Sequence, residues 1–545
     1  MKTRSILYKT LIAAMLCGIS SCSDDLEIEP NDQIAKENFF KSEEDFKAAT
    51  APLYNRVWFS FNDKFYFGLG DGRSYNLYAP YSDYIYPFSD LTETGLTGPL
   101  VEAWRSFYIV IQQSNNTIAA IEESTVSEEI RAQYIAEARF MRGTAYWYIA
   151  SLWGDAIITT SQSEIINNPL VNKNPREDVF EFAIRDLEYA AKYLPEQAGQ
   201  SGRVTKYSAY GMLSRLYLSA SGLSSNPNSG TRDQALLDLA KKAAEKAINE
   251  GPYMLLDDYA ELFTIENNNN SESMFALQWV PNGDYGVNNT HQAYFALGSE
   301  ITGDDAAWGY FTRASFDILE EYEANDARRK ATWMADGDFY PEISQANGGY
   351  LVEHENTYVN VKKGVVGSNK DNQSISRMNS GLNTYMLRLG EVYLNYAEAI
   401  LGNNGSTSDA TALMYVNALR ERAGLAPKTS LTFEDIFHER RVELCMEGQF
   451  WYDMVRRAYY EQQEMLNYID DQGRETVIPF TYDEENNRVE VDDTRDAAPR
   501  AIGQIDESIF LLPYPESEVV QNPLLRDAPV PYDFTEERIT DELFD

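Results

Sequence analysis

Aromatic rings and hydrogen-bonding side chains are interleaved in several stretches whose spacing suits neither a helix nor a strand. The longest is 71–86, where glycine and proline interrupt a run of tyrosines mixed with Asp, Arg and Asn, and 282–285, 304–310 and 333–340 are similar. Sugar rings present flat C–H faces that pack on aromatic rings, and their hydroxyls need polar side chains to replace hydrogen bonds to water. The pattern therefore predicts a surface that binds an oligosaccharide or polysaccharide.

Trp308 is the first candidate for such a surface, because Asp304, Asp305 and Gly309 surround it with loop-forming residues and give it few reasons to pack in a core. For any single ring the alternative is that it fills the interior of a loop-rich lobe. The candidate glycan-binding residues are Trp308, Tyr81, Tyr84, Tyr285, Trp333, Tyr75, Tyr78, Tyr310, Arg73, Asn76, Asp83 and Asp305.

Side chains suited to catalysis or metal binding are scarce apart from carboxylates. His291, His354 and His438 lie far apart in the sequence, and 438–442 lacks the second histidine of a zinc-protease helix. The chain has neither a phosphate-binding loop nor a nucleophile elbow, and 336–338 is more simply a turn than a calcium site. We expect a protein that is not an enzyme, with no cofactor and no metal, although the acidic residues leave a glycosidase carboxylate pair open.

The chain is strongly acidic, with 85 Asp and Glu against 46 Lys and Arg and a formal net charge of −39. Such a charge repels phosphate backbones, whose binding depends on basic patches, so nucleic acid is excluded as a partner. The same charge opposes adsorption to an anionic membrane surface. Attachment to a membrane would therefore need a lipid.

The N-terminus has the layout of a secretory signal, with basic residues before a short apolar run. This run is too short to span a bilayer of ~30 Å as a permanent helix. An isoleucine and two serines precede Cys22, which resembles the lipobox of bacterial lipoproteins. We expect 1–21 to be cleaved as a lipoprotein signal peptide, Cys22 to be acylated, and 22–30 to form an acidic tether.

The segments that position the aromatic stretches are mainly helical. Small residues such as Gly143 and Gly211 stand where paired helices must approach closely, as in a tetratricopeptide-like stack. The strict period of about 34 residues is missing, so we expect a degenerate stack. Apolar residues recur at three- and four-residue spacing, which marks one buried face per helix, in 130–153, 175–194, 206–221, 236–247, 387–401 and 413–424.

We expect a mainly α single domain over 31–545, built from this helical stack and a loop-rich irregular lobe. The lobe should carry the binding surface, because loops this long in an ordered protein are usually functional or disordered. The helical repeats are expected mainly in 100–255 and 385–460, and the lobe mainly in 59–99, 265–380 and 465–525.

Several segments, in order along the chain, resemble the signatures of the SusD/RagB family of outer-membrane nutrient-binding lipoproteins. The central signature is 136–155, which begins AEARFMRG, and LRLGEVYLNYAEA at 387–399 is close to diagnostic. The resemblance runs from the lipobox to about Asp527, with one departure at Gly390, where alanine is more usual. Further matching segments are 104–115, 186–206, 417–425, 439–448 and 512–524.

The resemblance implies a tetratricopeptide-like half, a loop-rich half and a partner, a SusC-like TonB-dependent transporter over which the lipoprotein sits as a lid. It also implies lipid anchoring in the cell outer membrane and capture of a glycan for delivery to the transporter. The acidic run directly after Cys22 resembles the surface-export signal of some lipoproteins, so we expect the domain on the extracellular side. We interpret Arg139, Arg142 and Asp155 of the signature as scaffold residues that tie helix to loop.

Three other functions remain open at this stage. Within the family, the RagB branch implies an oligopeptide ligand instead of a glycan. Outside it, the chain could be a tetratricopeptide scaffold for protein partners or a carboxylate-dependent glycosidase. The glycan-binding interpretation is preferred because the aromatic side chains in these stretches suit stacking against the faces of sugar rings. A peptide site would rely more on backbone donors and acceptors.

Overall fold

The computed structural model describes residues 40–280, 285–303, 307–353, 358–372, 378–483, 488–492, 494 and 497–544. The expected signal peptide, the tether, Cys22 and the candidate Asp305 lie outside these residues. Within the described part of the chain, no helix is both long and apolar enough to cross a membrane.

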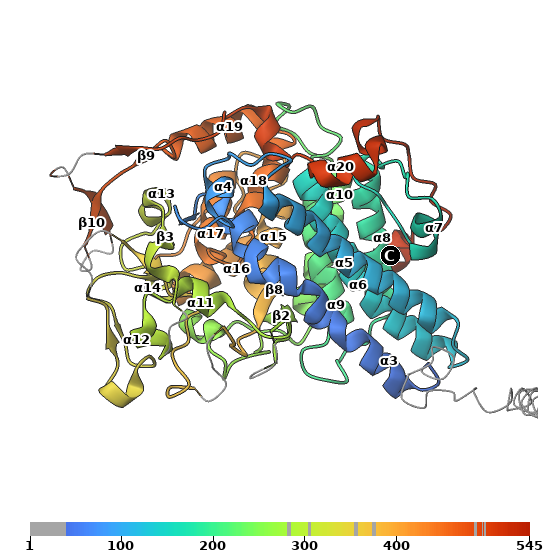
Figure 1. Ribbon diagram of the computed structural model, residues 1–545, viewed down its shortest axis with the longest axis horizontal. Coiled ribbons are helices and arrows are strands. Elements are labelled where there is room, and N and C mark those ends of the chain that lie inside the picture. The colour runs from blue at the N-terminus through green and yellow to red at the C-terminus, as the bar shows by residue number, and fades with distance from the viewer. Residues whose placement is uncertain are drawn as a thin grey trace, which may run out of the picture.

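Helices dominate the molecule, and α5, α6, α8, α9 and α10 gather on its right-hand side in Figure 1. They pack against one another in chain order, since α5 contacts α6, α6 contacts α8, and the series continues through α9, α10 and α15 to α16. This order gives the expected degenerate stack. The longer helices are α3 (Glu43–Thr50), α5 (Gly98–Glu122), α6 (Glu128–Trp153), α8 (Arg176–Tyr193), α9 (Lys206–Ala220), α10 (Gln234–Asn249), α15 (Leu389–Leu401), α16 (Ala410–Arg422), α17 (Phe433–Glu443), α18 (Phe450–Ala458) and α19 (Gln462–Asp471).

Local sequence fixes where these helices begin and how closely they pack. Thr205 starts α9 with a capping box, in which its hydroxyl accepts a bond from the backbone N–H of Ser208 and the Ser208 hydroxyl accepts one in return. At Gly143 of α6, a Cβ atom would lie 2.9 Å from the carbonyl oxygen of Ala183 in α8. The expectation that small residues mark close helix contacts is therefore confirmed at Gly143.

The start of α15 differs from the expected one. Residues Thr384–Arg388 form strand β8, which pairs with β2 (Ser273–Leu277), and the helix begins only at Leu389. The apolar residue Leu387 therefore lies in a strand. The prediction missed this boundary because the end of a strand and the start of a helix both bury apolar side chains, and a short apolar run does not distinguish them.

Short strands hold the loop-rich lobe together. A four-stranded antiparallel sheet has the order β1-β3-β7-β4, with β1 at Leu77–Tyr78, β3 at Arg313–Ala314, β7 at Asn360–Val361 and β4 at Trp333–Met334. It joins the first aromatic stretch to the middle of the chain. The remaining strands are β5 (Phe339–Tyr340), β6 (Tyr350–Leu351), β9 (Thr476–Val477), β10 (Phe480–Asp483), β11 (Arg488–Val491) and β12 (Ala498–Pro499).

Short helices complete the lobe and the edges of the stack (Figure 1). In the lobe they carry several of the candidate rings or their neighbours on short, rigid turns. These helices are α4 (Tyr86–Ser89), α7 (Gln162–Asn167), α11 (His291–Phe295), α12 (Ser299–Thr302), α13 (Phe316–Glu320), α14 (Ala327–Thr332), α20 (Glu516–Gln521) and α21 (Thr540–Phe544).

The segment before the first aromatic stretch is helical, contrary to the expected irregular run. Two π-helical turns, Phe61–Phe65 and Gly68–Gly72, follow one another there. The glycines that make the run look like a loop serve close packing, since a Cβ on Gly70 would lie 2.4 Å from the Cα atom of Gly448. This contact between distant segments has no signature in the local sequence.

Candidate functional site

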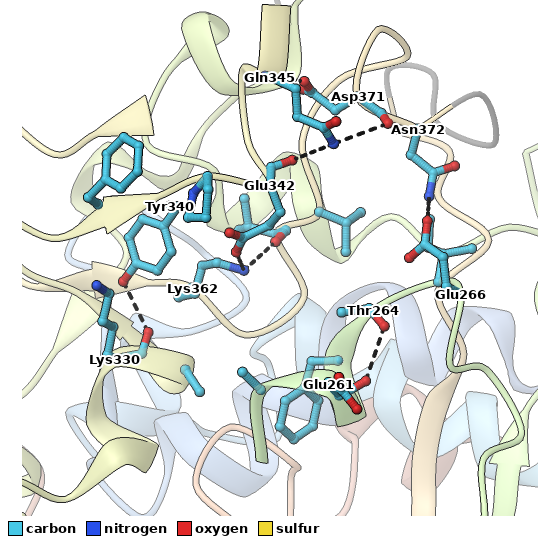
Figure 2. A pocket seen from close by; sticks show the side chains of 18 of the residues that line it. Glu261, Thr264, Glu266, Lys330, Tyr340, Glu342, Gln345, Lys362, Asp371 and Asn372 are labelled. Carbon is cyan, nitrogen blue, oxygen red and sulfur yellow. Dashed lines mark hydrogen bonds and ion pairs between the residues drawn. The ribbon is translucent and has the colours of Figure 1, made fainter. Parts of the chain in front are cut away.

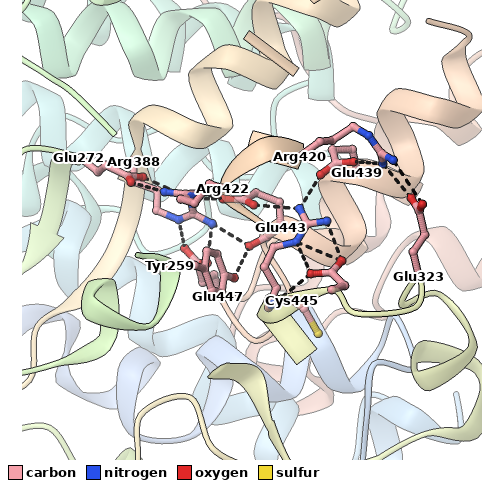
Figure 3. Close-up of polar contacts among 12 residues, drawn as sticks. Tyr259, Glu272, Glu323, Arg388, Arg420, Arg422, Glu439, Glu443, Cys445 and Glu447 are labelled. Carbon is pink, nitrogen blue, oxygen red and sulfur yellow. Dashed lines mark hydrogen bonds and ion pairs between the residues drawn. The ribbon is translucent and has the colours of Figure 1, made fainter. Parts of the chain in front are cut away.

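Buried charges lie where α15, α16 and α17 meet (Figure 3). Arg388 donates from Nε to Glu447 Oε2 at 2.7 Å and from Nη1 to Glu443 Oε1 at 2.7 Å, and Arg328 Nη1 donates to Glu443 Oε2 at 3.0 Å. Burial opposes ionisation of Glu443, but Arg422, Arg388 and Arg328 together hold its pKa well below its usual range. These charges are satisfied by one another, so the network ties helices together.

The signature residues of α6 have the expected scaffold role. Arg142 donates two hydrogen bonds to the carboxylate of Asp186 in α8, from Nε at 2.7 Å and from Nη2 at 2.8 Å. Arg139 Nε donates to the same carboxylate at 2.8 Å. Asp155 accepts a bond from the backbone N–H of Arg176 at 3.1 Å. All these bonds are internal to the chain, and none requires a ligand.

Exposed aromatic side chains of the loop-rich lobe form a surface that we call the aromatic rim. The exposed fraction of the side chain is 76% for Tyr81, 63% for Tyr285 and 46% for Trp308. Rings this large are normally buried in large part, so a contiguous exposed set marks a binding site. The rim consists of Tyr81, Tyr285, Tyr294, Trp308, Tyr310 and Phe311.

Edge-to-face contacts fix the orientation of these rings. The ring of Phe311 packs against Tyr81 with centroids 4.7 Å apart and against Tyr310 at 4.8 Å. Trp308 meets Tyr294 at 5.4 Å in the same geometry. Because Trp308, Tyr310 and Phe311 are joined by one short turn, the contacts link the rim into a continuous surface whose rings cannot turn freely.

A buried carboxylate anchors the other end of the rim. Asp63, from the first π-helical turn, accepts a bond from the Tyr285 hydroxyl at 3.0 Å and from the Thr290 hydroxyl at 2.5 Å, and the Tyr294 hydroxyl lies 3.4 Å away. Burial, reinforced by Asp63, raises the pKa of Tyr285 well above its usual range. The two tyrosine hydroxyls therefore share one carboxylate acceptor, which fixes their positions.

Polar groups stand beside these rings. Tyr84 is half-buried, and Lys64 Nζ lies 4.4 Å from the centre of its ring. Lys64 is also 3.8 Å from the exposed Glu102, and the predicted Asp83 is exposed on the same loop as Tyr84. A ligand stacked on the rim would find hydrogen-bonding partners of both charges here.

The structure buries three of the candidates from the sequence and so places them away from the rim. Trp333 has no exposed surface, and its Nε1 donates to the Tyr322 hydroxyl at 3.1 Å. The guanidinium of Arg73 lies 4.6 Å from the ring centre of Trp451, and Asn76 Nδ2 donates to Asp71 Oδ1 at 3.1 Å. Residues without an exposed face cannot stack on or contact a sugar at the surface.

Tyr75 and Tyr78 are buried as well, with exposed fractions of 5% and 9%, and therefore do not belong to the rim. They line a separate small cavity instead. Of the remaining predictions, Tyr81, Tyr285, Trp308 and Tyr310 lie together on the rim, and Tyr84 and Asp83 stand beside it.

A larger cavity of about 410 Å³ lies at another place in the lobe (Figure 2). Its polar side chains are paired with one another, as Lys362 Nζ lies 3.3 Å from Glu342 Oε1 and Asn372 Nδ2 donates to Glu266 Oε1 at 2.9 Å. Phe339 is the exposed ring in its wall, and no residue of the aromatic rim lines it. The cavity lacks the stacked rings that a sugar needs, so the rim is the better candidate.

Sequence reasoning missed Tyr294 and Phe311 of the rim and the lysine beside it. Phe311 follows Tyr310 directly, and a search for adjacent aromatic pairs in the loops would have found it. Tyr294 lies in the short helix α11, where its neighbour Phe295 is buried and gives the segment the look of a core helix. Among the described residues, no group of His, Cys, Asp and Glu has an arrangement that could hold a metal ion.

Two family models match the chain. The model of the SusD family covers residues 224–530, and a second model, described as starch-binding associating with outer membrane, covers residues 87–218. Together they include the rim except Tyr81, and most of the helical stack.

Individual proteins are similar over nearly the whole length. A SusD-like protein of Bacteroides ovatus is 40% identical over 96% of this chain and 98% of its own length. The starch-binding protein SusD of Bacteroides thetaiotaomicron is 27% identical over 65% of this chain and 69% of its own. A crystal structure with xylogluco-oligosaccharide, 40% identical, superposes with a TM-score of 0.83 over 90% of this chain and 100% of that one. The sequence signatures, the helical stack and these matches agree, and the chain belongs to the SusD family.

Proposed function

We propose that this protein binds an oligosaccharide or polysaccharide on the aromatic rim and does not cleave it. The exposure of Tyr81, Tyr285 and Trp308 carries the proposal, because nothing in the fold requires three large rings at the surface. Their neighbours fix their orientation before a ligand arrives. A preorganised platform loses little conformational entropy when it binds.

The relatives support the same ligand class. A similar protein is named for starch, and another, with 40% identity, has been crystallised with xylogluco-oligosaccharide. Both ligands are chains of sugar rings whose faces suit an aromatic platform. The buried carboxylate at the rim, Asp63, has structural partners, since it accepts bonds from tyrosine and threonine hydroxyls.

A titration panel tests binding and catalysis together. The full-length chain in detergent is titrated with xylogluco-oligosaccharides, malto-oligosaccharides and, for comparison, oligopeptides, and each mixture is then analysed by chromatography. We expect at least one glycan to bind and to be recovered intact. Cleavage of the glycan would identify a glycosidase, and binding of peptides alone would contradict the proposal.

We further propose that the protein is held in the outer membrane by lipid on Cys22, faces the cell exterior, and delivers its glycan to a SusC-like TonB-dependent transporter. A lid tethered over its transporter works at a high effective ligand concentration, so weak single-site affinity is sufficient. Each buried methylene of the lipid contributes ~0.8 kcal/mol. The expected result of Cys22→Ala is release from washed membranes, and the expected result of affinity purification of the parent is recovery of the transporter.

A further inference from the structure

A small cavity beside the rim contains an arginine that forms no ion pair with a carboxylate of the described residues. Arg313, on strand β3, is 9% exposed, and its guanidinium lies 3.9 Å from the ring centre of Tyr358 and 5.2 Å from that of Tyr78. Its Nη1 has no hydrogen-bond partner among the described residues. Burial lowers the pKa of Arg313, and the nearby groups that oppose this shift are tyrosines. A buried guanidinium is normally paired with an acid, so Arg313 departs from the usual pattern.

The cavity is built to receive a single small group. It has a volume of about 220 Å³, which is below the ~300–1,000 Å³ of sites for drug-sized molecules. Tyr75, Tyr78 and Tyr358 line it together with Arg313, and the β9–β10 segment supplies Phe480. Small, apolar and uncharged polar residues complete the walls, and Arg313 is the one charged side chain among the described residues that line them.

The cavity adjoins the aromatic rim. Tyr358, which lines the cavity, packs edge-on against Tyr310 of the rim with centroids 6.2 Å apart. Tyr310 in turn contacts Phe311, which contacts Tyr81. A glycan stacked on the rim therefore lies within reach of the cavity with one of its substituents.

Two further arginines lie beside the cavity, together with the carboxylates of Asp90 and Asp317. Arg500 donates to the Tyr75 hydroxyl at 2.6 Å and lies 3.9 Å from the ring centre of Tyr78, and it is paired with Asp90. The fully buried Arg474 lies 5.0 Å from the ring centre of Tyr75 and donates only to carbonyl and amide oxygens in the described structure. Burial lowers the pKa of Arg474 to about 9, so it is still charged at neutral pH.

We infer that this cavity is a subsite for an anionic substituent of the bound glycan, the carboxylate of a uronic acid or a sulfate ester. The inference rests on the proposed glycan-binding function and names a chemical class within it. A planar guanidinium matches the two oxygens of a carboxylate and forms charge-assisted bonds of about twice the strength of neutral ones. A hydroxymethyl group at the same position would leave the charge of Arg313 uncompensated.

Matched pairs of ligands test the subsite. The full-length chain in detergent is titrated with cello-oligosaccharide and with its C6-oxidised oligoglucuronate, with xylo-oligosaccharides that carry or lack glucuronosyl branches, and with a neutral oligosaccharide and its sulfated form. We expect the anionic member of at least one pair to bind at least about tenfold more tightly, with an advantage that shrinks as salt is added. The uronate and sulfate arms identify which anion is preferred.

Variants link the preference to the arginine. Arg313→Gln should remove the advantage of the anionic ligand and leave the affinity for the neutral one unchanged, whereas Arg313→Lys should retain part of it. The matched control is Arg105→Gln, which removes the same charge from an exposed side chain on α5. If Arg313→Gln unfolds, the Arg313→Lys protein and the salt dependence of the parent still decide the question.

The outcomes separate the two proposals. Equal binding of both members in every pair, or weaker binding of the anionic one, would overturn the anionic subsite and leave the glycan-binding function intact. An anionic preference that survives Arg313→Gln would also overturn it. Failure of every glycan to bind would refute the proposed function and the subsite with it.

Discussion

The helical stack and the loop-rich lobe use the same kinds of side chain in opposite ways. In the stack, Arg388 and Arg142 are buried and bound to carboxylates, and Trp147 has an exposed fraction of only 2%. In the lobe, Trp308 and Tyr285 are about half exposed or more, and Arg313 Nη1 has no hydrogen-bond partner among the described residues. The stack satisfies its polar and aromatic groups internally, whereas the lobe leaves surfaces that a ligand can satisfy.

The two regions should therefore respond differently to substitution. A change in the stack removes an internal partner and should lower the free energy of unfolding. A change on the rim removes a surface ring with few internal contacts, so it should alter ligand affinity and leave the fold intact.

Leu394→Asp should have the largest effect. Leu394 lies on α15 with no exposed surface, and the substitution removes apolar contacts and buries an unpaired charge. Removal of a buried leucine side chain alone costs about 2–5 kcal/mol, and the charge adds to this loss. Urea unfolding followed by circular dichroism measures it. An unchanged unfolding midpoint would mean that this face of α15 is not buried.

Arg388→Met should destabilise the chain by about 3–5 kcal/mol, because it removes one of the cations that compensate the buried carboxylates of Glu443 and Glu447. The same urea experiment measures the change. Lys241→Ala is the matched control, since its pair with Glu245 is one turn apart and about a third exposed on both sides. Such a pair is worth at most ~0.5 kcal/mol. Similar losses in the two variants would contradict the scaffold role of the network.

A third test uses pH and a buried histidine beneath the rim. Burial lowers the pKa of His291 from its ordinary 6.5 to about 4, while its Nε2 lies 2.6 Å from the carbonyl oxygen of Asn62. As the pH falls from about 6.5 to 4, the unfolded chain gains a proton that the native chain does not, so native stability is lost over this range. The loss from this group is up to about 3 kcal/mol.

His291→Gln should reduce that loss, as measured by the difference in unfolding free energy between pH 7 and pH 4.5. Burial also raises the pKa of Asp71 to about 6, an effect of opposite sign that the parent and the variant share. The comparison between the two proteins therefore isolates His291. Equal pH dependence in both would show that the histidine is not held neutral.

Much of the fold followed from the sequence. Three- and four-residue spacing found α6, α8, α9, α10 and α16 to within a few residues, because one buried stripe per helix leaves a periodic record. The start of α15 and the π-helical turns were missed. There the pattern reflects contacts between distant segments, such as Gly70 against Gly448, and local periodicity contains no trace of them.

The candidate site was predictable by region rather than by residue. Composition located the aromatic stretches, and Tyr81, Tyr285, Trp308 and Tyr310 are exposed as a surface site requires. Composition could not distinguish these exposed rings from the buried Trp333. An aromatic residue next to Asp and Gly has the same local sequence whether its loop folds toward the core or toward solvent. Arg313 was missed for a related reason, since its lack of an ion pair among the described residues is visible only in three dimensions.

Two tryptophans of the lobe provide the most direct test of the account. The oligosaccharide that binds best in the panel is titrated by calorimetry against the parent, Trp308→Ala and Trp333→Ala, and thermal unfolding of each protein is recorded. Trp308→Ala should weaken binding about tenfold, equivalent to ~1.4 kcal/mol, with an unchanged unfolding midpoint. Trp333→Ala should lose about 3–5 kcal/mol of stability. Parent-like affinity in Trp308→Ala, and equally in Tyr81→Ala and Tyr285→Ala, would contradict the claim that the aromatic rim binds the glycan.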